Sequence, residues 1–228
     1  MNNSVIEAEK ISKKYQMGDS VVTALDRVSF KILEGDFISI IGDSGSGKST
    51  LLNMIGLLDR SSHGRIKLLG KDISGLSDDS LARLRNQTIG FVFQQFNLLS
   101  RTSAMDNVLL PAWYNDSLDM EDARKRAVEH FVMFDLEDRM NHFPNQLSGG
   151  EQQRVAIIRA LICDPKIILA DEPTGNLDSK SGGEIMDLLL ELNKKLNKTL
   201  ILVSHNPQQA ALAKKKIYLK DGKVVKSL

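Results

Sequence analysis

Cysteine is almost absent from this chain of 228 residues, which carries Cys163 alone. One thiol excludes an internal disulfide, and a chain of this length buries enough apolar surface to fold without one. Cys163 lies in an apolar helical pattern, so we expect a small buried side chain there. A single cysteine is also consistent with a reducing compartment, the cytosol.

Long apolar runs are missing too, because no stretch approaches the ~20 residues that a membrane-spanning helix needs. Residues 1–5 lack the basic-then-apolar pattern of a secretory signal. We therefore expect another chain to supply any membrane part. An excess of charge is equally absent, since 30 basic and 29 acidic residues leave a net charge of +1. Charge alone therefore indicates no polyanionic partner, and we expect a single α/β domain over residues 1–228.

What the chain does contain is one complete phosphate-binding loop pattern, G-x-x-x-x-G-K-[ST]. Glycines let backbone N–H groups approach phosphate oxygens, lysine places a positive charge on the outer phosphates, and a serine hydroxyl can bind Mg²⁺. The apolar run 37–41 predicts a buried strand before the loop, and residues 49–55 predict a helix after it. This context disfavours an ordinary Gly/Ser turn. The loop consists of Gly42, Asp43, Ser44, Gly45, Ser46, Gly47, Lys48 and Ser49.

Three further apolar runs predict buried strands, and each ends at a polar side chain. Ligands of open parallel sheets bind at the carboxyl ends of the strands. We therefore expect these ends and the phosphate loop to converge on one nucleotide. The runs are 89–93 before Gln94, 167–170 before Asp171 and Glu172, and 199–204 before His205.

These strand-end side chains suit distinct tasks around a triphosphate. Asp171 suits a water-mediated Mg²⁺ contact, and Glu172 beside it suits a general base for the attacking water. Gln94 can reach both the ion and the water, and His205 can donate a hydrogen bond to the γ-phosphate. The alternatives are an N-cap for the aspartate, surface positions for the glutamate and glutamine, and a structural role for the histidine. We interpret the other histidines as structural or solvated: His63, His130 and His142.

The rest of the pattern predicts a small antiparallel sheet and a helical segment. Residues 28–33 alternate in polarity, which predicts a half-buried strand, and residues 65–68 are expected to form a further short strand. Asp221-Gly222 predicts a closing hairpin, and residues 100–165 are mainly helical. One apolar stripe in this segment is expected to pack in the core. The stripe consists of Met120, Ala123, Ala127, Phe131 and Phe134. In a separate part of the chain, Ser77 is expected to cap a helix that begins after it.

A second glycine pair follows at Leu147-Ser148-Gly149-Gly150-Glu151. Ser148 and Glu151 predict a capping box at a helix start. Gly149 and Gly150 expose N–H groups at the positive end of that helix, where a further phosphate can bind. The two interpretations are compatible, although a capped start does not by itself need two glycines.

Taken together, these motifs resemble those of the nucleotide-binding subunits of ABC transporters, over essentially the whole chain. The resemblance implies an α/β fold of the P-loop NTPase type. A RecA-like parallel-sheet core would carry an antiparallel β subdomain and a helical subdomain at about residues 95–165. The matching motifs are the Walker A loop 42–49, the Q-loop Gln94, the signature 147–151, Walker B 167–172, the D-loop 175–178 and the switch histidine His205.

The resemblance further implies an ATPase that uses ATP and Mg²⁺. Tyr15, which spacing alone leaves as a surface aromatic, would stack on adenine. Two copies would pack head to tail, with the signature of one closing over ATP held by the other. The implied catalytic residues are Glu172, His205 and Lys48; the nucleotide ligands are Tyr15, residues 42–49, Thr50, Gln94, Ser148, Gly149 and Gly150; the Mg²⁺ ligands are Ser49, Gln94 and Asp171.

Residues 89–99 and 170–178 look like the LolD/MacB group, which includes lipoprotein-releasing, macrolide and peptide efflux, and FtsE-like cell-division ATPases. This likeness implies integral membrane permease partners, a periplasmic or extracellular adaptor in some systems, no nucleic acid, and a place on the cytoplasmic face of the membrane. One alternative is a soluble non-transport ABC ATPase, although those usually carry two cassettes or a coiled-coil insertion. The other is an amino-acid importer subunit, whose D-loop region usually differs.

Overall fold

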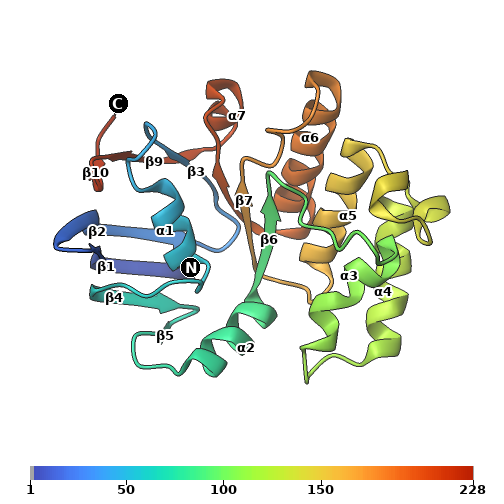
Figure 1. Ribbon diagram of the computed structural model, residues 1–228, viewed down its shortest axis with the longest axis horizontal. Coiled ribbons are helices and arrows are strands. Elements are labelled where there is room, and N and C mark those ends of the chain that lie inside the picture. Colours follow the sequence, from blue (N-terminus) through green and yellow to red (C-terminus); the bar gives the residue numbers. More distant parts are fainter. Residues whose placement is uncertain (1–2, 228) are drawn as a thin grey trace. The chain divides into compact units, whose positions relative to one another are not determined.

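The computed structural model describes residues 3–227, which divide into two compact units (Figure 1). Unit 1 contains the chain up to Ala82 and from Asn197 onward, and unit 2 contains Arg83–Leu196. Helix α2 (Asp78–Thr88) spans the division. Its first turn is capped as expected, because the Ser80 amide donates to Ser77 Oγ at 3.3 Å. Within residues 3–227, none of the helices combines the length and apolar character required to cross a membrane.

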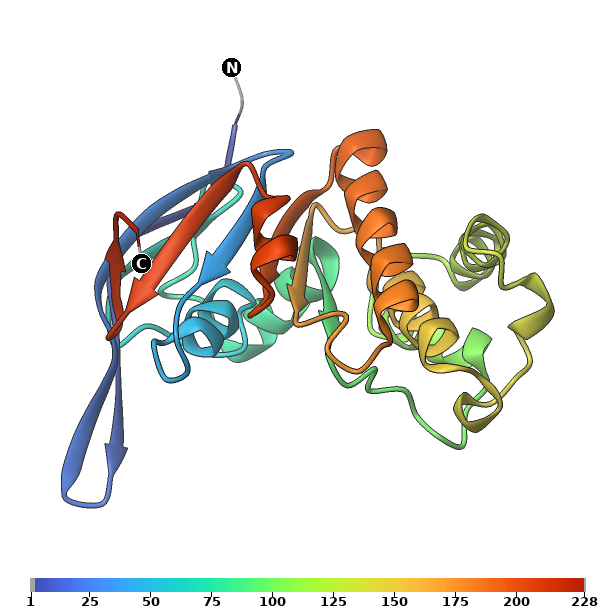
Figure 2. The same ribbon diagram turned by 90° about the horizontal axis from the view of Figure 1, so that it is seen from above.

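An antiparallel sheet forms one part of unit 1, in the strand order β2-β1-β4-β5. This confirms the expected small antiparallel sheet. The β1–β2 pair is interrupted by register shifts, and Lys10 and Arg27 take positive φ angles of 47° and 49°. The hairpin that joins the two strands extends well beyond the rest of unit 1 (Figure 2). The strands are β1 (Ser4–Met17), β2 (Ser20–Leu33), β4 (His63–Leu68) and β5 (Lys71–Asp72).

Parallel strands form the other part of unit 1. Strand β3 lies between β8 and β9 and is parallel to both, while β9 and β10 form an antiparallel hairpin. Asp221 and Gly222 turn this hairpin with positive φ angles of 48° and 74°, as the sequence predicts. Strand β3 is buried except at its last residue, and β8 is buried along its whole length. The elements are β3 (Phe37–Ile41), α1 (Lys48–Ile55), β8 (Thr199–Val203), α7 (Pro207–Ala211), β9 (Lys215–Lys220) and β10 (Lys223–Val225).

Unit 2 combines two parallel strands with four long helices and two short 3₁₀ turns. Helix α5 is its central helix, because it contacts α3, α4, α6 and β6. Its residues 155–158 are completely buried. The elements are β6 (Ile89–Phe93), α3 (Ala104–Trp113), α4 (Met120–Met133), η1 (Glu137–Arg139), η2 (Pro144–Gln146), α5 (Gly149–Leu161), β7 (Ile167–Asp171) and α6 (Ser179–Leu196).

Two expectations about unit 2 are wrong in part. Four members of the predicted α4 stripe are buried, but Met120 is 38% exposed. It is the first residue of α4, and helix side chains tilt toward the N-terminus, so Met120 extends past the start of the helix at the end of the stripe. Cys163 is only partly buried, because α5 ends at Leu161 and the cysteine follows that end. Its partial burial still raises the pKa of the thiol.

Candidate nucleotide-binding site

The phosphate-loop residues connect β3 to α1 within unit 1. Gly47 is the N-cap of α1 with a φ of 102°, and an added Cβ there would lie 2.6 Å from the carbonyl oxygen of Ala24. Only glycine fits such a position. No side chain caps α1, and its first turn holds no acidic residue. The amide groups at this helix start are therefore available to an anion.

Lys48 is folded back over the loop. Its Nζ donates to the carbonyl oxygens of Gly42 at 2.7 Å and of Asp43 at 2.8 Å. Ser46 turns inward, and its buried Oγ has no hydrogen-bond partner within residues 3–227. Ser49 is exposed at the helix start and Thr50 is partly buried. The loop thus holds a cation and a polar group at its centre, as a phosphate site requires.

Tyr15 lies in β1, and its hydroxyl donates to Asp59 Oδ2 at 2.8 Å. Lys13 pairs with the same carboxylate, and its Nζ lies 4.9 Å from the centre of the Tyr15 ring. Burial, followed by the bond to Asp59, raises the pKa of Tyr15. Burial also opposes ionisation of Asp59, but the bonds from Lys13 and Tyr15 outweigh it and lower the pKa of that carboxyl. Sequence reasoning missed both Lys13 and Asp59, which are 46 residues apart in the chain.

His205 belongs to the same edge of unit 1 as the phosphate loop. Strands β3 and β8 are parallel neighbours with Ile40 paired to Val203, so Gly42 and His205 both follow their carboxyl ends. The side chain of His205 is exposed, and α7 begins two residues later behind its N-cap Asn206. Unit 1 therefore places the phosphate loop and His205 after neighbouring strand ends, as expected for parallel strands.

Gln94 and the Asp171-Glu172 pair are brought together within unit 2. Strands β6 and β7 are parallel with Phe93 paired to Asp171, so Gln94 and Glu172 follow neighbouring strand ends. The side-chain Nε2 of Gln94 donates to Asn176 Oδ1 at 3.2 Å, and Asn176 Nδ2 donates to the main-chain carbonyl oxygen of Gln94 at 3.0 Å. The Q-loop and the D-loop are thus joined by a reciprocal amide pair that the sequence did not reveal.

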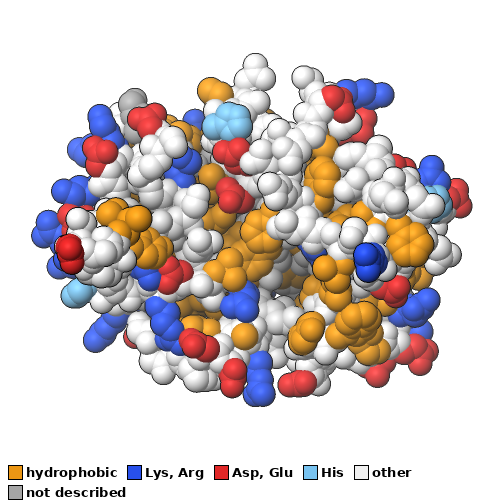
Figure 3. All heavy atoms as spheres, viewed as in Figure 1, with side chains coloured by type: hydrophobic (Ala, Val, Ile, Leu, Met, Phe, Trp, Pro, Cys, Tyr) orange, Lys and Arg blue, Asp and Glu red, His pale blue; other side chains and the backbone are white. Residues whose placement is uncertain are grey.

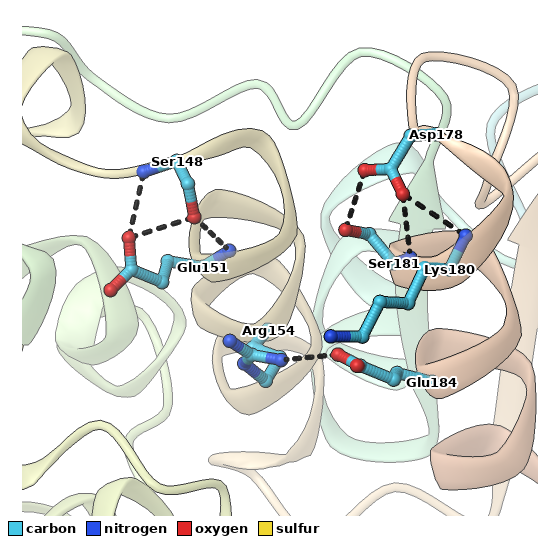
Figure 4. Close-up of polar contacts among 7 residues, drawn as sticks. All are labelled: Ser148, Glu151, Arg154, Asp178, Lys180, Ser181 and Glu184. Carbon is cyan, nitrogen blue, oxygen red and sulfur yellow. Dashed lines mark hydrogen bonds and ion pairs between the residues drawn. The ribbon is translucent and has the colours of Figure 1, made fainter.

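The signature residues begin α5 with Ser148 as N-cap and Glu151 three residues later, and the predicted capping box is confirmed. The Ser148 amide and hydroxyl both donate to Glu151 Oε2, at 2.7 and 2.8 Å (Figure 4). Arg139 Nε donates to the other carboxylate oxygen at 2.9 Å. Burial alone would raise the pKa of Glu151, but the bonds from Ser148 and Arg139 lower it to about 2. Arg139 lies in a short turn with no sequence signal, so it was not predicted.

The start of α6 lies beside this signature start. Asp178 caps α6, accepting from the amides of Lys180 and Ser181 and from Ser181 Oγ at 2.6 Å (Figure 4). A Cβ added at Gly150 would lie 3.5 Å from the Ser181 side chain. Arg154 also pairs with Glu184 across the two helices at 3.4 Å. The signature and the D-loop therefore form one surface of unit 2.

The comparison with protein families decides what this arrangement is. The family model described as ABC transporter matches residues 25–175. The chain belongs to the ABC transporter family. An ABC transporter ATP-binding domain binds and hydrolyses ATP, so the expectation of an ATPase of this family is confirmed.

Similar ABC proteins support the same assignment. The chain is 52% identical over 221 residues to the macrolide export ATP-binding/permease protein MacB of Chlorobaculum tepidum, matching 97% of this chain and 34% of that protein. It is 50% identical to the ABC transporter ATP-binding protein MJ0796 of Methanocaldococcus jannaschii, matching 96% and 95% of the two chains. The chain thus spans about a third of MacB and nearly all of MJ0796.

A solved dimeric structure of MJ0796 bound to ADP and Pi matches this ABC domain with a TM-score of 0.87. The two are 48% identical, and the match covers 96% of each chain. This likeness confirms the expected ABC ATPase fold.

Proposed function

We propose that this chain binds Mg-ATP at the loop Gly42–Ser49 and hydrolyses it in a head-to-tail dimer that drives membrane partner subunits. The observation that carries the proposal is the uncapped start of α1, which lies beneath a lysine held only by loop carbonyls. Both features favour a bound triphosphate, because no side chain caps the amides at the helix start and the ammonium can exchange carbonyls for phosphate oxygens.

Nucleotide binding would use the groups that unit 1 gathers. Amides of Gly45 to Ser49 would surround the phosphates while Lys48 turns from the loop carbonyls to the outer phosphates. Tyr15 is 37% exposed with its hydroxyl tied to Asp59, so its ring is held in place and can stack on adenine. The fixed ring supports the stacking role that the ABC family resemblance implies.

The proposed Mg²⁺ ligands fit this ion by their chemistry. Ser49, Gln94 and Asp171 offer a hydroxyl, an amide oxygen and a carboxylate, all hard oxygen donors. Magnesium in phosphate sites uses one or two carboxylates together with substrate phosphates and waters, which matches a set with a single acid. When bound, the ion would neutralise charge that develops on the phosphates.

Hydrolysis would proceed by attack of a water on the γ-phosphorus. Glu172 accepts a proton from that water, an oxygen–phosphorus bond forms, and the bond to the β–γ bridging oxygen breaks, giving ADP and phosphate. His205 would donate a hydrogen bond to a γ-phosphate oxygen and hold it in line for the attack. A positioned general base contributes roughly 10²–10⁴-fold to such a rate.

The second copy would supply Ser148, Gly149 and Gly150 to the γ-phosphate. Ser148 is exposed at the start of α5, and both glycines leave their amides close to the surface. Two positive helix starts, α1 from one copy and α5 from the other, would then enclose each ATP. The solved structures of MJ0796 are dimeric, which supports a pair of chains as the working unit.

Membrane partners are proposed from the MacB relatives, in which an ATP-binding region and a permease share one chain. Unit 2 exposes apolar side chains that suit such a contact, and Figure 3 shows hydrophobic side chains gathered over the α3–α4 region. The ABC family resemblance places the permease contact at about residues 95–100, and packing inside the helical subdomain is the alternative for the apolar side chains there. Leu99 is 51% exposed, whereas Phe96 and Leu98 are partly buried. The exposed apolar side chains of unit 2 include those of Leu99, Trp113, Tyr114 and Met133.

Within this class we favour the LolD/MacB group, with lipoprotein release, efflux or mechanical coupling as its task. The place of work would be the cytoplasmic face of the membrane, and a periplasmic or extracellular adaptor would belong to some such systems. An FtsE-like, importer or soluble non-transport role is the alternative. Purification from detergent-solubilised membranes separates the soluble non-transport class from the others, because only a membrane-associated subunit should bring along an integral membrane protein.

The decisive experiment on the site is Lys48→Ala. Steady-state hydrolysis with Mg²⁺ should fall to background and nucleotide affinity should weaken, because no other side-chain cation lies in the loop. Lys71→Ala is a matched control, since Lys71 is exposed in β5 of the same unit. Hydrolysis by Lys48→Ala at the rate of the control would remove the loop from the mechanism.

A further inference from the structure

Gln153 is a completely buried amide in the second turn of α5, five residues after Ser148. Its Nε2 donates to the carbonyl oxygen of Pro173 at 2.6 Å and to that of Phe93 at 3.3 Å. Glutamine is mostly exposed in folded proteins, so a completely buried one needs a reason. Here the amide joins helix α5 to the last residue of β6 and to the chain just after β7.

The orientation of this amide is fixed by its neighbours. Two carbonyl oxygens accept from it, so the nitrogen must face them, and a flipped amide would set oxygen against oxygen. Gln153 Oε1 is then buried and has no hydrogen-bond partner in the described part of the chain. A buried acceptor without a partner is unfavourable, and an apolar side chain would avoid it. Compared with an apolar side chain at this position, the amide therefore offers only its two donated hydrogen bonds.

Both bonds hold main chain that flanks a proposed functional residue. Phe93 ends β6 immediately before Gln94, and Pro173 immediately follows Glu172. Strands β6 and β7 are already paired at Phe93 and Asp171, and Gln153 adds a link beyond that pairing, from the end of β6 to the main chain just after Glu172. It does so from the same helix whose start carries the signature residues.

The main chain at Glu172 needs to be held. Its φ is 46°, in the left-handed region that residues other than glycine rarely adopt. A residue before proline is also normally extended, and Glu172 precedes Pro173. Such conformations persist when the surrounding structure enforces them, and they concentrate at functional sites. The bonds that hold this turn include those from Gly175 N to Glu172 O at 3.0 Å and from Gln153 Nε2 to Pro173 O.

We propose that Gln153 is a positioning residue for ATP hydrolysis, which keeps Glu172 and Gln94 in place through their backbones without touching the nucleotide. The proposal rests on the proposed role of Glu172 as the base. Helix α5 has other anchors, because Arg159 donates to the carbonyls of Phe96 and Asn97 at 2.8 and 2.6 Å. Loss of the Gln153 amide should therefore release the turn after β7 while the fold persists.

The test is Gln153→Met, which keeps the length and the packing volume but donates no hydrogen bond. We expect kcat to fall about 10- to 100-fold, because a displacement of about 1 Å at a catalytic group has an effect of this size. KM for ATP should stay within about twofold, because the phosphate loop belongs to unit 1. A wild-type kcat, or a KM that rises as much as kcat falls, would overturn the proposal.

The matched control is Asn107→Leu, which removes another completely buried amide of unit 2. Asn107 bonds Leu99, Thr102 and Ser103 and contacts neither carbonyl that Gln153 holds. It should lower the melting temperature and leave kcat unchanged. An equal loss of kcat in this control would show that any buried amide of unit 2 matters alike, and would overturn the specific role of Gln153.

Two further variants complete the design. If Gln153→Met does not fold, Gln153→Asn keeps an amide that is too short to reach both carbonyls, and its kcat should still fall with KM unchanged. Glu172→Gln must be inactive for the premise to hold, and hydrolysis by it would overturn the role of Glu172. In the Glu172→Gln background, Gln153→Met should not change ATP-dependent dimerisation in sedimentation. A loss of dimer would assign Gln153 to assembly instead and overturn the proposal.

Discussion

Helices α1 and α5 each have glycine at or beside their first residue, yet the two helix starts are built differently. The start of α1 has Gly47 as its N-cap and no side chain that accepts from its amides. The start of α5 is closed by Ser148 and Glu151, with Arg139 bonded to the glutamate. The first is open to a phosphate at all times. At the second, a phosphate must compete with Glu151 for the Ser148 hydroxyl. We infer that α1 provides affinity and that α5 responds to a nucleotide already bound.

The largest effect is expected from closing the open start with Gly47→Ala. The new Cβ would lie 2.6 Å from Ala24 O at a φ of 102°, so the loop must shift. ATP binding should be lost in titration calorimetry, and stability should fall by about 2 kcal/mol or more. Gly183→Ala is the control, because its Cβ meets open space inside α6 and should stabilise by about 0.5–1 kcal/mol. Unchanged ATP affinity in Gly47→Ala would mean that this helix start is not the phosphate site.

The next effect concerns the dimer. Glu172→Gln should trap an ATP-bound pair, because the base is lost while the two helix starts remain. Sedimentation should show a dimer with Mg-ATP and a return toward monomer with ADP, whose missing γ-phosphate removes the bridge. Adding Ser148→Arg should prevent the dimer, because the larger side chain fills the place of the γ-phosphate. A chain that stays monomeric at high concentration with saturating Mg-ATP would contradict the head-to-tail arrangement.

Mixing chains sharpens the same comparison. A Lys48→Ala chain paired with a Ser148→Arg chain has one intact composite site and one doubly broken site. Activity should partly return in the mixture, although each variant alone is inactive. Full activity of Ser148→Arg alone would contradict a role for α5 in the partner's site.

The sequence predicted the open start better than the closed one. The open start depends on strand β3, the phosphate loop with Lys48, and helix α1, which together span 19 residues. The local sequence pattern is therefore enough to predict it. The capping box of α5 is equally local and was predicted. Arg139, however, reaches Glu151 from a 3₁₀ turn whose place is set by tertiary packing. The same holds for Gln153, because nothing in helical periodicity distinguishes a buried glutamine that holds two carbonyls from an exposed one.

A smaller effect is expected when the closed start is opened by Ser148→Ala. The substitution removes both bonds of the hydroxyl, which accepts from the Glu151 amide and donates to the Glu151 carboxylate. Stability should fall by about 1 kcal/mol, as for other N-cap losses. Urea unfolding of the isolated chain measures it, with Ser44→Ala as control because Ser44 is exposed in the loop. If Ser148→Ala lowers the free energy of unfolding no more than Ser44→Ala does, Ser148 does not stabilise α5.

The smallest effect is the pH dependence of the closed start. The pKa of Glu151 is lowered from 4.5 to about 2. The contribution of its carboxylate to the free energy of unfolding is therefore complete above pH 4.5 and is lost as the pH falls toward 2. Glu151→Gln should be less stable at pH 7 by about 1 kcal/mol and should lose less stability in acid. The difference between the two unfolding curves isolates this carboxyl from the others that titrate. A difference that does not change between pH 5 and pH 2.5 would contradict the lowered pKa.

The bulged hairpin of unit 1 has a consequence for solubility. Strand β2 is a 14-residue edge strand, and a regular edge of that length invites pairing with other chains. Its regularity is broken at Arg27 by a positive φ, and Asp26 N donates to Gly222 O at 2.8 Å, outside its own sheet. Arg27 and Lys31 add charge along the same strand. The twist and charge of this edge should therefore oppose strand-to-strand aggregation while the chain is concentrated or newly made.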